Sequence, residues 1–309
     1  MAQSTALRIG TRGSPLALAQ AREVRARLAA AHGLDAGRIE LRAIRTSGDM
    51  VQDRPLTDIG GKGLFTKEID QALIDGAIDL AVHSAKDLPT VLPLGLAIAG
   101  YLPREDARDA FISRKAPTLG ELAHGAVVGT ASLRRQAMVR RLRPDLAVTL
   151  FRGNVETRLR KLDEGVVDAT LLAMAGLNRL GRADAATSVL SVEEFPPAVG
   201  QGAIAIAARA DDADTRDLLA AIVDADTASA LAAERAFLAV LDGSCRTPIA
   251  GHAIVEGHNL RFFGLILRPD GSQVFEARRG GDRAEAAALG ADAGMELKGR
   301  APADFFVHE

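Results

Sequence analysis

Residues 7–20 read LRIGTRGSPLALAQ, and this stretch decides the class of fold. The apolar run at residues 7–11 predicts a strand, and the pair Ser14 and Pro15 marks the first turn of a helix. The helical pattern stops before Gly33, a residue type that commonly ends helices. A strand that passes into a helix through a short turn predicts an α/β fold.

The same alternation of apolar runs and helical patterns continues along the first two-thirds of the chain. We predict further strands at residues 39–44, 78–82, 96–100, 109–113, 126–129, 147–150, 167–172 and 203–208. We predict further helices at residues 64–74, 132–143, 154–164 and a short one that ends near residue 180. This order favours mostly parallel sheets covered by helices. Because the strand at 203–208 follows a complete second set of elements, we expect the chain to cross back into the first set.

The last third of the chain has a different pattern. Helices are predicted at about residues 228–241 and 282–295, with strands at 249–255, 260–267 and 273–278 between them. The sequence PDGS at residues 269–272 is a hairpin turn signal. This part therefore predicts a small α+β domain with an antiparallel sheet.

The patterns together predict two α/β lobes with mostly parallel sheets, joined by a hinge, and a small C-terminal domain. Lobe 1 is expected to comprise residues 1–103 and 201–221, lobe 2 residues 104–200, and the C-terminal domain residues 222–309. The chain would change lobes near residues 103–108 and 196–202, with a cleft between the lobes.

Composition excludes several classes of function. The chain has 309 residues, of which 48% are hydrophobic and 25% charged, as in soluble globular proteins with a sizeable core. The net charge of −2 gives no nucleic-acid or membrane signature, and no apolar run reaches the ~18–20 residues of a membrane span. A single cysteine without an export signal predicts the reducing cytoplasm. No long apolar stripe argues for assembly, so we expect a monomer.

Three turns between a strand and a helix share one design. They lie at residues 11–14 (TRGS), 129–135 (GTASLRR) and 151–158 (FRGNVETR). Each combines arginine with a hydroxyl or amide side chain at a helix start, where backbone N–H groups and the helix dipole favour an anion. Arginine favours planar anions such as carboxylates. Ordinary helix capping would explain any one of these turns, but three, all on loops that follow strands, favour an anion-binding site, because ligands bind at that edge of parallel sheets.

The stretch HSAKDLP at residues 83–89 ends a predicted buried strand with polar groups. A lone aspartate is usually a cap or a turn residue, but Asp87 follows Lys86 at the end of a strand that faces the predicted anion site. Asp87 is therefore a candidate general acid.

The histidines show no metal-binding spacing, so no metal is predicted, and no Ser-His-Asp or Cys-His-Asn pattern is recognisable.

The glycine-rich stretch GGKGLF at residues 60–65 resembles a phosphate-binding loop but does not match its pattern. Lys62 is followed by Gly63 instead of serine or threonine. With TSGD upstream at residues 46–49, we interpret residues 46–63 as a mobile lid over the cleft.

Cys245 is the only cysteine, so it forms no internal disulfide. It is either an inert core sulfur, as most lone cysteines are, or a point of covalent attachment. Gly243 and Ser244 suit a turn after the predicted helix, and the adjacent Arg246 favours the reactive thiolate.

Taken together, these residues resemble the porphobilinogen deaminase family, whose members are also called hydroxymethylbilane synthases. The resemblance covers about residues 8–250 and rests on the segments 8–17, 60–65, 81–89, 129–136, 150–154, 173–181, 197–202 and 243–248. It implies two lobes similar to type II periplasmic binding proteins and a third domain. It also implies a dipyrromethane cofactor, joined by a thioether to Cys245, on which four porphobilinogen units condense with loss of ammonia before hydrolysis frees a linear tetrapyrrole.

The resemblance further implies roles for individual residues. Asp87 would protonate the leaving amine and stabilise the cationic azafulvene that forms. Lys62 and Phe65 would belong to the lid and the cleft wall. The residues implied to hold the cofactor are Ser84, Lys86, Thr130, Ser132, Arg134, Arg135 and Asn154. Those implied to hold the substrate and the growing chain are Arg12, Ser14, Arg152, Arg158 and Arg179.

The sequence departs from the family pattern at two places. Ser244 stands where a second glycine is common and Ala131 where a serine is common, and the second change affects a minor cofactor contact.

Two other classes of function stay open at this point. A non-catalytic two-lobed anion-binding protein would need neither Asp87 nor Cys245, and would usually carry an export signal. A thiol-dependent hydrolase would need a histidine partner, and no histidine lies in such a motif.

Overall fold

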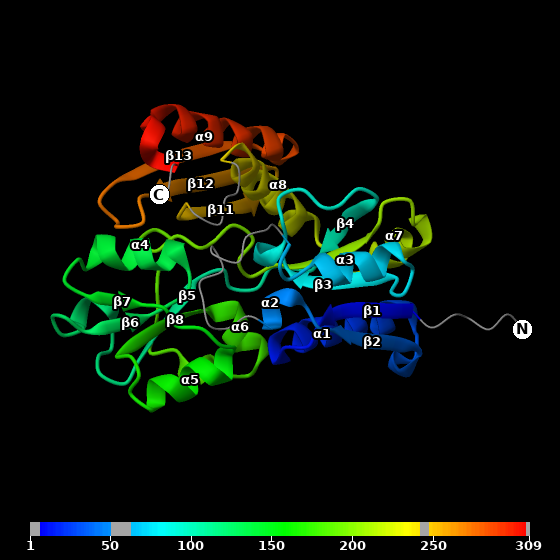
Figure 1. Cartoon of the computed structure of the whole chain (residues 1–309). Coiled ribbons are helices and arrows are strands. Elements are labelled where there is room, and N and C mark those ends of the chain that lie inside the picture. Colours follow the sequence, from blue (N-terminus) through cyan, green and yellow to red (C-terminus); the bar gives the residue numbers. More distant parts are fainter. Residues whose placement is uncertain (1–6, 51–62, 242–246, 307–309) are drawn as a thin grey trace, which may run out of the picture. The chain divides into compact units, whose positions relative to one another are not determined.

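A computed structural model of the chain describes residues 7–50, 63–241 and 247–306 (Figure 1). These residues form two compact units, which we call unit 1 and unit 2. Unit 1 contains residues 7–50, 63–105 and 203–228, and unit 2 contains residues 106–202, 229–241 and 247–306. The predicted division into two lobes and a C-terminal domain stays a prediction.

Unit 1 is built on a five-stranded sheet with the strand order β2-β1-β3-β10-β4. Its strands are β1 Leu7–Arg12, β2 Ile39–Ile44, β3 Leu80–Ser84, β4 Leu96–Tyr101 and β10 Ile204–Arg209. The first three pair in parallel, and β10 pairs antiparallel with both β3 and β4. The late strand therefore returns to the first sheet, as its position in the sequence predicted.

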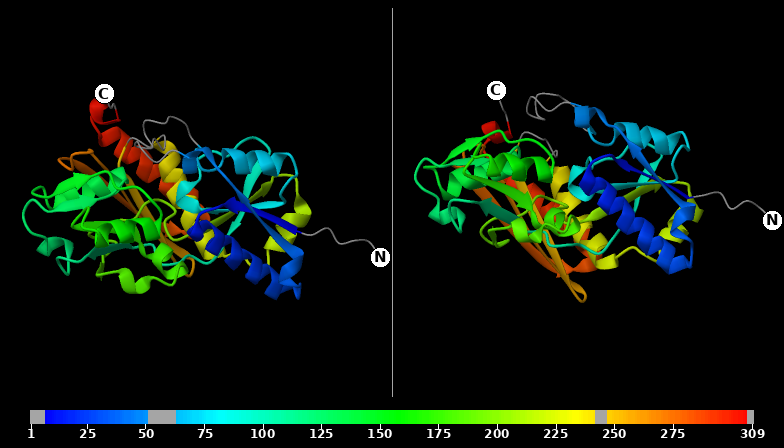
Figure 2. Two further views of the ribbon diagram at one scale, coloured as in Figure 1. Left: turned by 60° about the horizontal axis from the view of Figure 1, so that its bottom comes forward. Right: turned by 90° about the horizontal axis from the view of Figure 1, so that it is seen from below.

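Helices cover both faces of this sheet (Figure 2). Helix α1 (Pro15–His32) packs Val24 and Leu28 on one face, and α3 (Lys67–Ile74) packs Ile69 and Leu73 on the other. Ser14 caps α1 by accepting a hydrogen bond from the Ala17 N–H at 3.3 Å. The start of α1 thus follows the predicted capping chemistry. The remaining helices of this part are α2 Ser47–Met50 and α7 Ala213–Leu219, neither of which was predicted as a helix, and α8 Ala225–Val240, which continues into unit 2.

Unit 2 repeats this topology in a second five-stranded sheet, with the order β7-β6-β8-β5-β9. Its strands are β5 Asp109–Ser113, β6 Val127–Gly129, β7 Ala147–Thr149, β8 Ala169–Ala173 and the short, unpredicted β9 Ser188–Val189. Here β6, β7 and β8 are parallel, and β5 enters antiparallel between β8 and β9. In each five-stranded sheet one strand runs against the other four, which confirms the prediction of mostly parallel sheets.

The helices of this sheet are α4 Leu133–Leu142, α5 Val155–Asp163 and α6 Met174–Arg179. They follow β6, β7 and β8 respectively, so each occupies the position that the alternating pattern predicted. Leu159 and Leu162 of α5 pack in one hydrophobic cluster, whereas Met138 of α4 belongs to another.

The C-terminal part of unit 2 is an antiparallel sheet of three strands, β11 Ile249–Glu256, β12 Asn259–Leu267 and β13 Val274–Asp282, with α9 Ala286–Arg300 against it. This confirms the predicted α+β pattern. Leu265 and Leu267 of β12 share a hydrophobic cluster with Phe111 of β5 and Met138 of α4. The C-terminal sheet and the second five-stranded sheet therefore have a common core. Within the described residues, no helix is long and apolar enough to cross a membrane.

The predicted crossing at residues 196–202 is held in unit 2 by buried polar contacts. The N–H groups of Gly200 and Ala253 both donate to the Glu234 carboxylate, at 2.7 and 2.8 Å. Glu234 has no exposed surface, and its two carboxylate oxygens are satisfied by these backbone groups. The change of unit therefore falls after residue 202, at the end of the predicted crossing.

Candidate functional site

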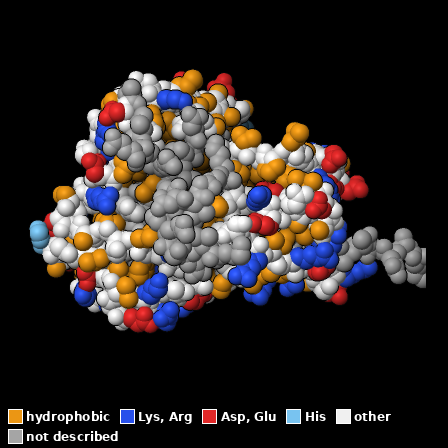
Figure 3. Space-filling view, in the orientation of Figure 1, with side chains coloured by type: hydrophobic (Ala, Val, Ile, Leu, Met, Phe, Trp, Pro, Cys, Tyr) orange, Lys and Arg blue, Asp and Glu red, His pale blue; other side chains and the backbone are white. Residues whose placement is uncertain are grey.

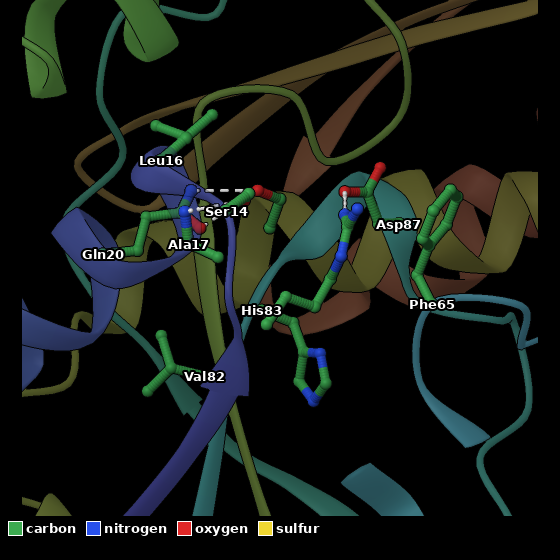
Figure 4. Close-up of a pocket in the computed structure, with 10 residues that line it drawn as sticks. Ser14, Leu16, Ala17, Gln20, Phe65, Val82, His83 and Asp87 are labelled. Atoms are coloured by element: carbon green, nitrogen blue, oxygen red, sulfur yellow. Dashed lines mark hydrogen bonds and ion pairs between the residues drawn. The ribbon is translucent and has the colours of Figure 1, made fainter. Parts of the chain in front are cut away.

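A pocket of unit 1 lies at the ends of the neighbouring parallel strands β1 and β3 (Figure 4). It encloses about 390 Å³ of space, a figure that includes open solvent at its mouth. Its lining residues are Arg12, Ser14, Leu16, Ala17, Gln20, Phe65, Val82, His83, Ser84 and Asp87. The carboxyl ends of parallel strands are where α/β proteins commonly bind ligands.

Asp87 and Arg12 form the charged centre of this pocket. Asp87 ends a short 3-10 helix, Ala85–Asp87, that follows β3, and Arg12 is the last residue of β1. Their closest charged atoms, Asp87 Oδ2 and Arg12 Nη1, are 3.9 Å apart. Arg12 Cζ also lies 4.1 Å from the centre of the Phe65 ring, a cation–π distance. The Asp87 side chain is 36% exposed, so a bound molecule can reach its carboxylate.

The opposite wall of the pocket is formed by α1 and the end of β3. The Gln20 side chain donates to Ser84 Oγ at 2.9 Å, and Ser14 stands at the start of the same helix. Gln20 is 3% exposed and was missed by the sequence analysis. The signal for it is a polar side chain on the apolar face of α1, in line with Ala17 and Val24. Lys86 precedes Asp87, but its side chain is exposed and does not line the pocket.

His83 brings a buried imidazole to the pocket wall, and the sequence analysis assigned it no role. Its side chain is only 5% exposed, and its Nε2 has no hydrogen-bond partner in the described part of the chain. Burial, aided by the positive charge of Arg12, lowers the pKa of His83 to about 4. The ring is therefore neutral at physiological pH, which avoids placing a second positive charge beside Arg12.

The depressed pKa of His83 predicts a dependence of stability on pH. The unfolded chain takes up the proton near pH 6.5 and the folded chain only near 4, so the unfolded state binds more protons between these values. The contribution to stability is complete above pH 6.5 and is lost as pH falls toward 4, on the order of 2–3 kcal/mol. Urea unfolding between pH 7 and 4.5 should show this slope, and His83→Gln should reduce it. Equal slopes for the two proteins would contradict the assignment.

In unit 2, Arg134 and Arg135 are buried against Asp109, the first residue of β5. Arg134 Nη2 and Arg135 Nη2 each lie 2.6 Å from a different carboxylate oxygen of Asp109. Arg134 also donates to the Pro196 carbonyl at 2.7 Å, and Arg135 to the Leu171 carbonyl at 2.8 Å. Most donors of these two predicted cofactor ligands are therefore used inside the protein, although Arg134 Nε has no partner among the described residues.

Helix capping, the simpler explanation of the three turns, is present at each of them. Ser132 caps its helix in the same way as Ser14. Its Oγ accepts a hydrogen bond from the backbone N–H of Arg135, three residues further on, at 3.4 Å. Asn154 accepts from the N–H of Thr157 at 2.8 Å. Thr130 is buried, and its Oγ1 accepts from the Ser132 N–H at 3.2 Å. Capping fixes the shape of these turns but leaves open what their arginines bind.

Positive charge accumulates around Arg158 of α5. Its Nε donates to the Gly153 carbonyl at 2.9 Å. Burial, together with the positive charges of Arg135 and Arg152, lowers the pKa of Arg158 to about 10. Three guanidinium groups held close enough to affect one another are typical of a site for an anion. Arg179, at the end of α6, donates to the Gly202 carbonyl at 2.9 Å.

The predicted residues Lys62 and Cys245 lie outside the described residues. Among the residues that are described, no group of three or more His, Cys, Asp or Glu side chains is placed to hold a metal ion. On the face drawn in Figure 3, described basic and acidic side chains are interspersed, in keeping with the net charge of −2.

Comparisons with family models and with related sequences agree on one family. Residues 7–217 match the family model "Porphobilinogen deaminase, dipyromethane cofactor binding domain", and residues 227–299 match "Porphobilinogen deaminase, C-terminal domain". The chain is 63% identical over 299 residues to the porphobilinogen deaminase of Nitrobacter hamburgensis, covering 97% of this chain and 95% of that protein. It is 59% identical over 300 residues to the porphobilinogen deaminase of Paracoccus denitrificans, covering 97% and 96%.

Solved structures give a more distant likeness. A periplasmic substrate-binding protein of an ABC transporter from Coxiella burnetii is similar with a TM-score of 0.45 and 16% identity, over 72% of this chain and 94% of that one.

Proposed function

Because the chain belongs to the porphobilinogen deaminase family, we propose that it condenses four porphobilinogen units and hydrolyses the product to the linear tetrapyrrole hydroxymethylbilane. It is a transferase, and hydroxymethylbilane synthase is the specific activity that we assign to it. The observation that carries the proposal is the unit 1 pocket, where the accessible carboxylate of Asp87 lies 3.9 Å from Arg12. A carboxyl group next to a carboxylate-binding cation suits a substrate that carries both an amine and carboxylates.

We propose that Asp87 donates a proton to the amine of porphobilinogen as ammonia leaves. The same carboxylate, once ionised, then stabilises the positive charge that develops on the pyrrole. Arg12 and Ser14 would hold a substrate carboxylate at the start of α1, where the helix dipole adds to the attraction. The apolar walls formed by Leu16, Val82 and Phe65 would exclude water from the ring.

The residues of unit 2 fit a cofactor that carries several carboxylates. The lowered pKa of Arg158, caused by burial and by Arg135 and Arg152, supports this proposal, because a bound anion would relieve the repulsion there. When bound, dipyrromethane would supply the pyrrole carbon to which the first unit is joined, and each later unit would be joined to the end of the growing chain. We propose that Arg152, Arg158 and Arg179 bind carboxylates of the substrate and the growing chain.

The remaining proposed cofactor ligands are Ser84, Lys86, Thr130, Ser132, Arg134, Arg135 and Asn154. The contacts of Arg134 and Arg135 with Asp109 indicate how these two would act. Their donors are largely used, so we propose that they serve the cofactor through their charge and by fixing the capped turn at Thr130 and Ser132. We propose that Lys62 and Phe65 belong to a lid and to the cleft wall.

The proposed function is tested by incubating the purified chain with porphobilinogen and measuring ammonia and linear tetrapyrrole together. We expect four ammonia molecules for each tetrapyrrole, because one amine leaves in each condensation. A non-catalytic anion-binding protein would bind porphobilinogen without consuming it. Binding without release of ammonia would therefore refute the enzymatic proposal in favour of that alternative.

We further propose that the cofactor is held by a thioether to Cys245. The chain has one cysteine, so intact-protein mass spectrometry gives an unambiguous readout. We expect freshly purified active protein to exceed the mass of its sequence by one dipyrromethane, and Cys245→Ser to have the mass of its own sequence. A dipyrromethane adduct that persists in Cys245→Ser, or active protein at the unmodified mass, would contradict the attachment.

Compartment and assembly stay predictions. We propose that the protein works in the cytoplasm, where a reducing environment keeps the Cys245 thiol available for attachment. We also propose that it works as a monomer, which size-exclusion chromatography with light scattering would test.

A further inference from the structure

Gly48 is packed against the ring of Phe65, outside the set of residues that line the pocket. A Cβ added at Gly48 would lie 2.4 Å from Cε1 and 2.5 Å from Cδ1 of Phe65, and 2.8 Å from the Leu64 carbonyl oxygen. Carbon atoms in contact are normally about 3.5–4.0 Å apart. Any side chain at position 48 therefore requires the Phe65 ring or its backbone to move.

Two further contacts hold Gly48 in this position. Its N–H donates to the Leu64 carbonyl at 2.8 Å, and the neighbouring Ser47 N–H donates to Glu68 Oε1 at 3.0 Å. The Ser47 hydroxyl also bonds to the same oxygen of Glu68. Ser47 and Gly48, at the start of α2, are thus fixed to Glu68 of α3 and to Leu64 just before it. Relief of a clash by a simple shift of α2 would break these hydrogen bonds.

Phe65 connects Gly48 to the pocket, because its ring contacts Gly48 and also lines the pocket. Its ring also lies beside the Arg12 guanidinium, whose Cζ is 4.1 Å from the ring centre, and Arg12 lies 3.9 Å from Asp87. We propose that Gly48 is a positioning residue: the missing side chain lets Phe65 lie where its ring supports Arg12 beside Asp87. This inference rests on the proposed function, because Arg12 is there assigned to a carboxylate of the substrate.

The variant Gly48→Ala tests the inference through the kinetics with porphobilinogen. We expect kcat/KM to fall about tenfold, which corresponds to ~1.4 kcal/mol of transition-state binding. The loss should fall mainly on KM, because the displaced group is the one that binds substrate, whereas Asp87 is not contacted by Gly48. Gly299→Ala is the matched control, because a Cβ there meets no atom within 4 Å. It should leave both parameters unchanged.

A double-mutant cycle separates this role from a general structural one. Phe65→Leu removes the ring that Gly48 contacts, so adding Gly48→Ala to it should change kcat/KM by less than about twofold. The clash with the Leu64 carbonyl oxygen, at 2.8 Å, remains in that background. If Gly48→Ala instead causes the same loss in both backgrounds, the effect comes from the backbone and the inference is wrong. It is also wrong if Gly48→Ala has the kinetics of the unaltered chain.

Urea unfolding of the same proteins covers the case in which Gly48→Ala weakens the fold. A midpoint that Gly48→Ala lowers in the unaltered chain but not in the Phe65→Leu background supports the ring contact, and one that it lowers equally in both contradicts it. If the proposed function is wrong, the unaltered chain will release no ammonia from porphobilinogen, which distinguishes this outcome from the others. The inference about Gly48 would then be wrong as well.

Discussion

Asp87→Ala is expected to lower the rate of tetrapyrrole formation by about 10³-fold and to leave the fold intact. Positioned proton donors contribute about 10²–10⁴-fold, and the same carboxylate is proposed to stabilise the developing positive charge. The fold should survive because Asp87 is 36% exposed and its ion pair with Arg12 is 3.9 Å long. Removal of such a carboxylate leaves no buried charge without compensation.

Two further variants sharpen this test. Asp87→Asn keeps the shape of the side chain but cannot act as the acid, so it should resemble Asp87→Ala in single-turnover rate. Asp163→Ala removes a carboxylate from the exposed pair with Arg114 and should retain full activity. Urea midpoints of all three proteins should match that of the unaltered chain. Turnover by Asp87→Asn within tenfold of normal would exclude the acid role.

The local design of the fold could be predicted from the sequence because neighbouring residues determine it. Ser14 and Pro15 define the start of α1, and Gly33 ends it in the left-handed conformation with φ of 60°. The return of β10 to the first sheet followed from the order of elements alone. Such features depend on short-range chemistry and on connectivity, both of which one sequence contains.

The site could be predicted only in part, because several of its side-chain contacts join segments that are far apart in the sequence. Asp109 appeared in the sequence as the first residue of a strand, and nothing nearby indicates that Arg134 and Arg135 surround it. Gln20 and Ser84 are 64 positions apart, and their hydrogen bond depends on how α1 packs on β3. The arginines at three helix starts suggested that all of them bind an anionic ligand. Arg134 and Arg135, however, are held mainly by the buried carboxylate of Asp109.

This buried carboxylate makes Asp109 a position where a single change should strongly affect stability. Burial alone raises the pKa of Asp109, but the charges and hydrogen bonds of Arg134 and Arg135 outweigh it and hold the pKa well below its usual range. Asp109→Ala would leave two buried guanidinium groups without their counter-ion. We expect the free energy of unfolding to fall by about 3–5 kcal/mol. Glu256→Gln, in an exposed pair with Arg261, is the control and should change little.

The pH dependence of the same variants distinguishes charge from packing. A carboxyl group with a lowered folded pKa contributes stability above its unfolded pKa of about 3.9, and this contribution is lost as pH falls below that value. Asp109→Asn keeps the volume of the side chain but has no proton to gain, so its stability should fall less between pH 5 and 3 than that of the unaltered chain. If the two proteins lose stability in parallel over this range, packing and not charge accounts for the effect of Asp109. In that case Arg134 and Arg135 would be freer to bind the carboxylates of the cofactor directly than their contacts with Asp109 indicate.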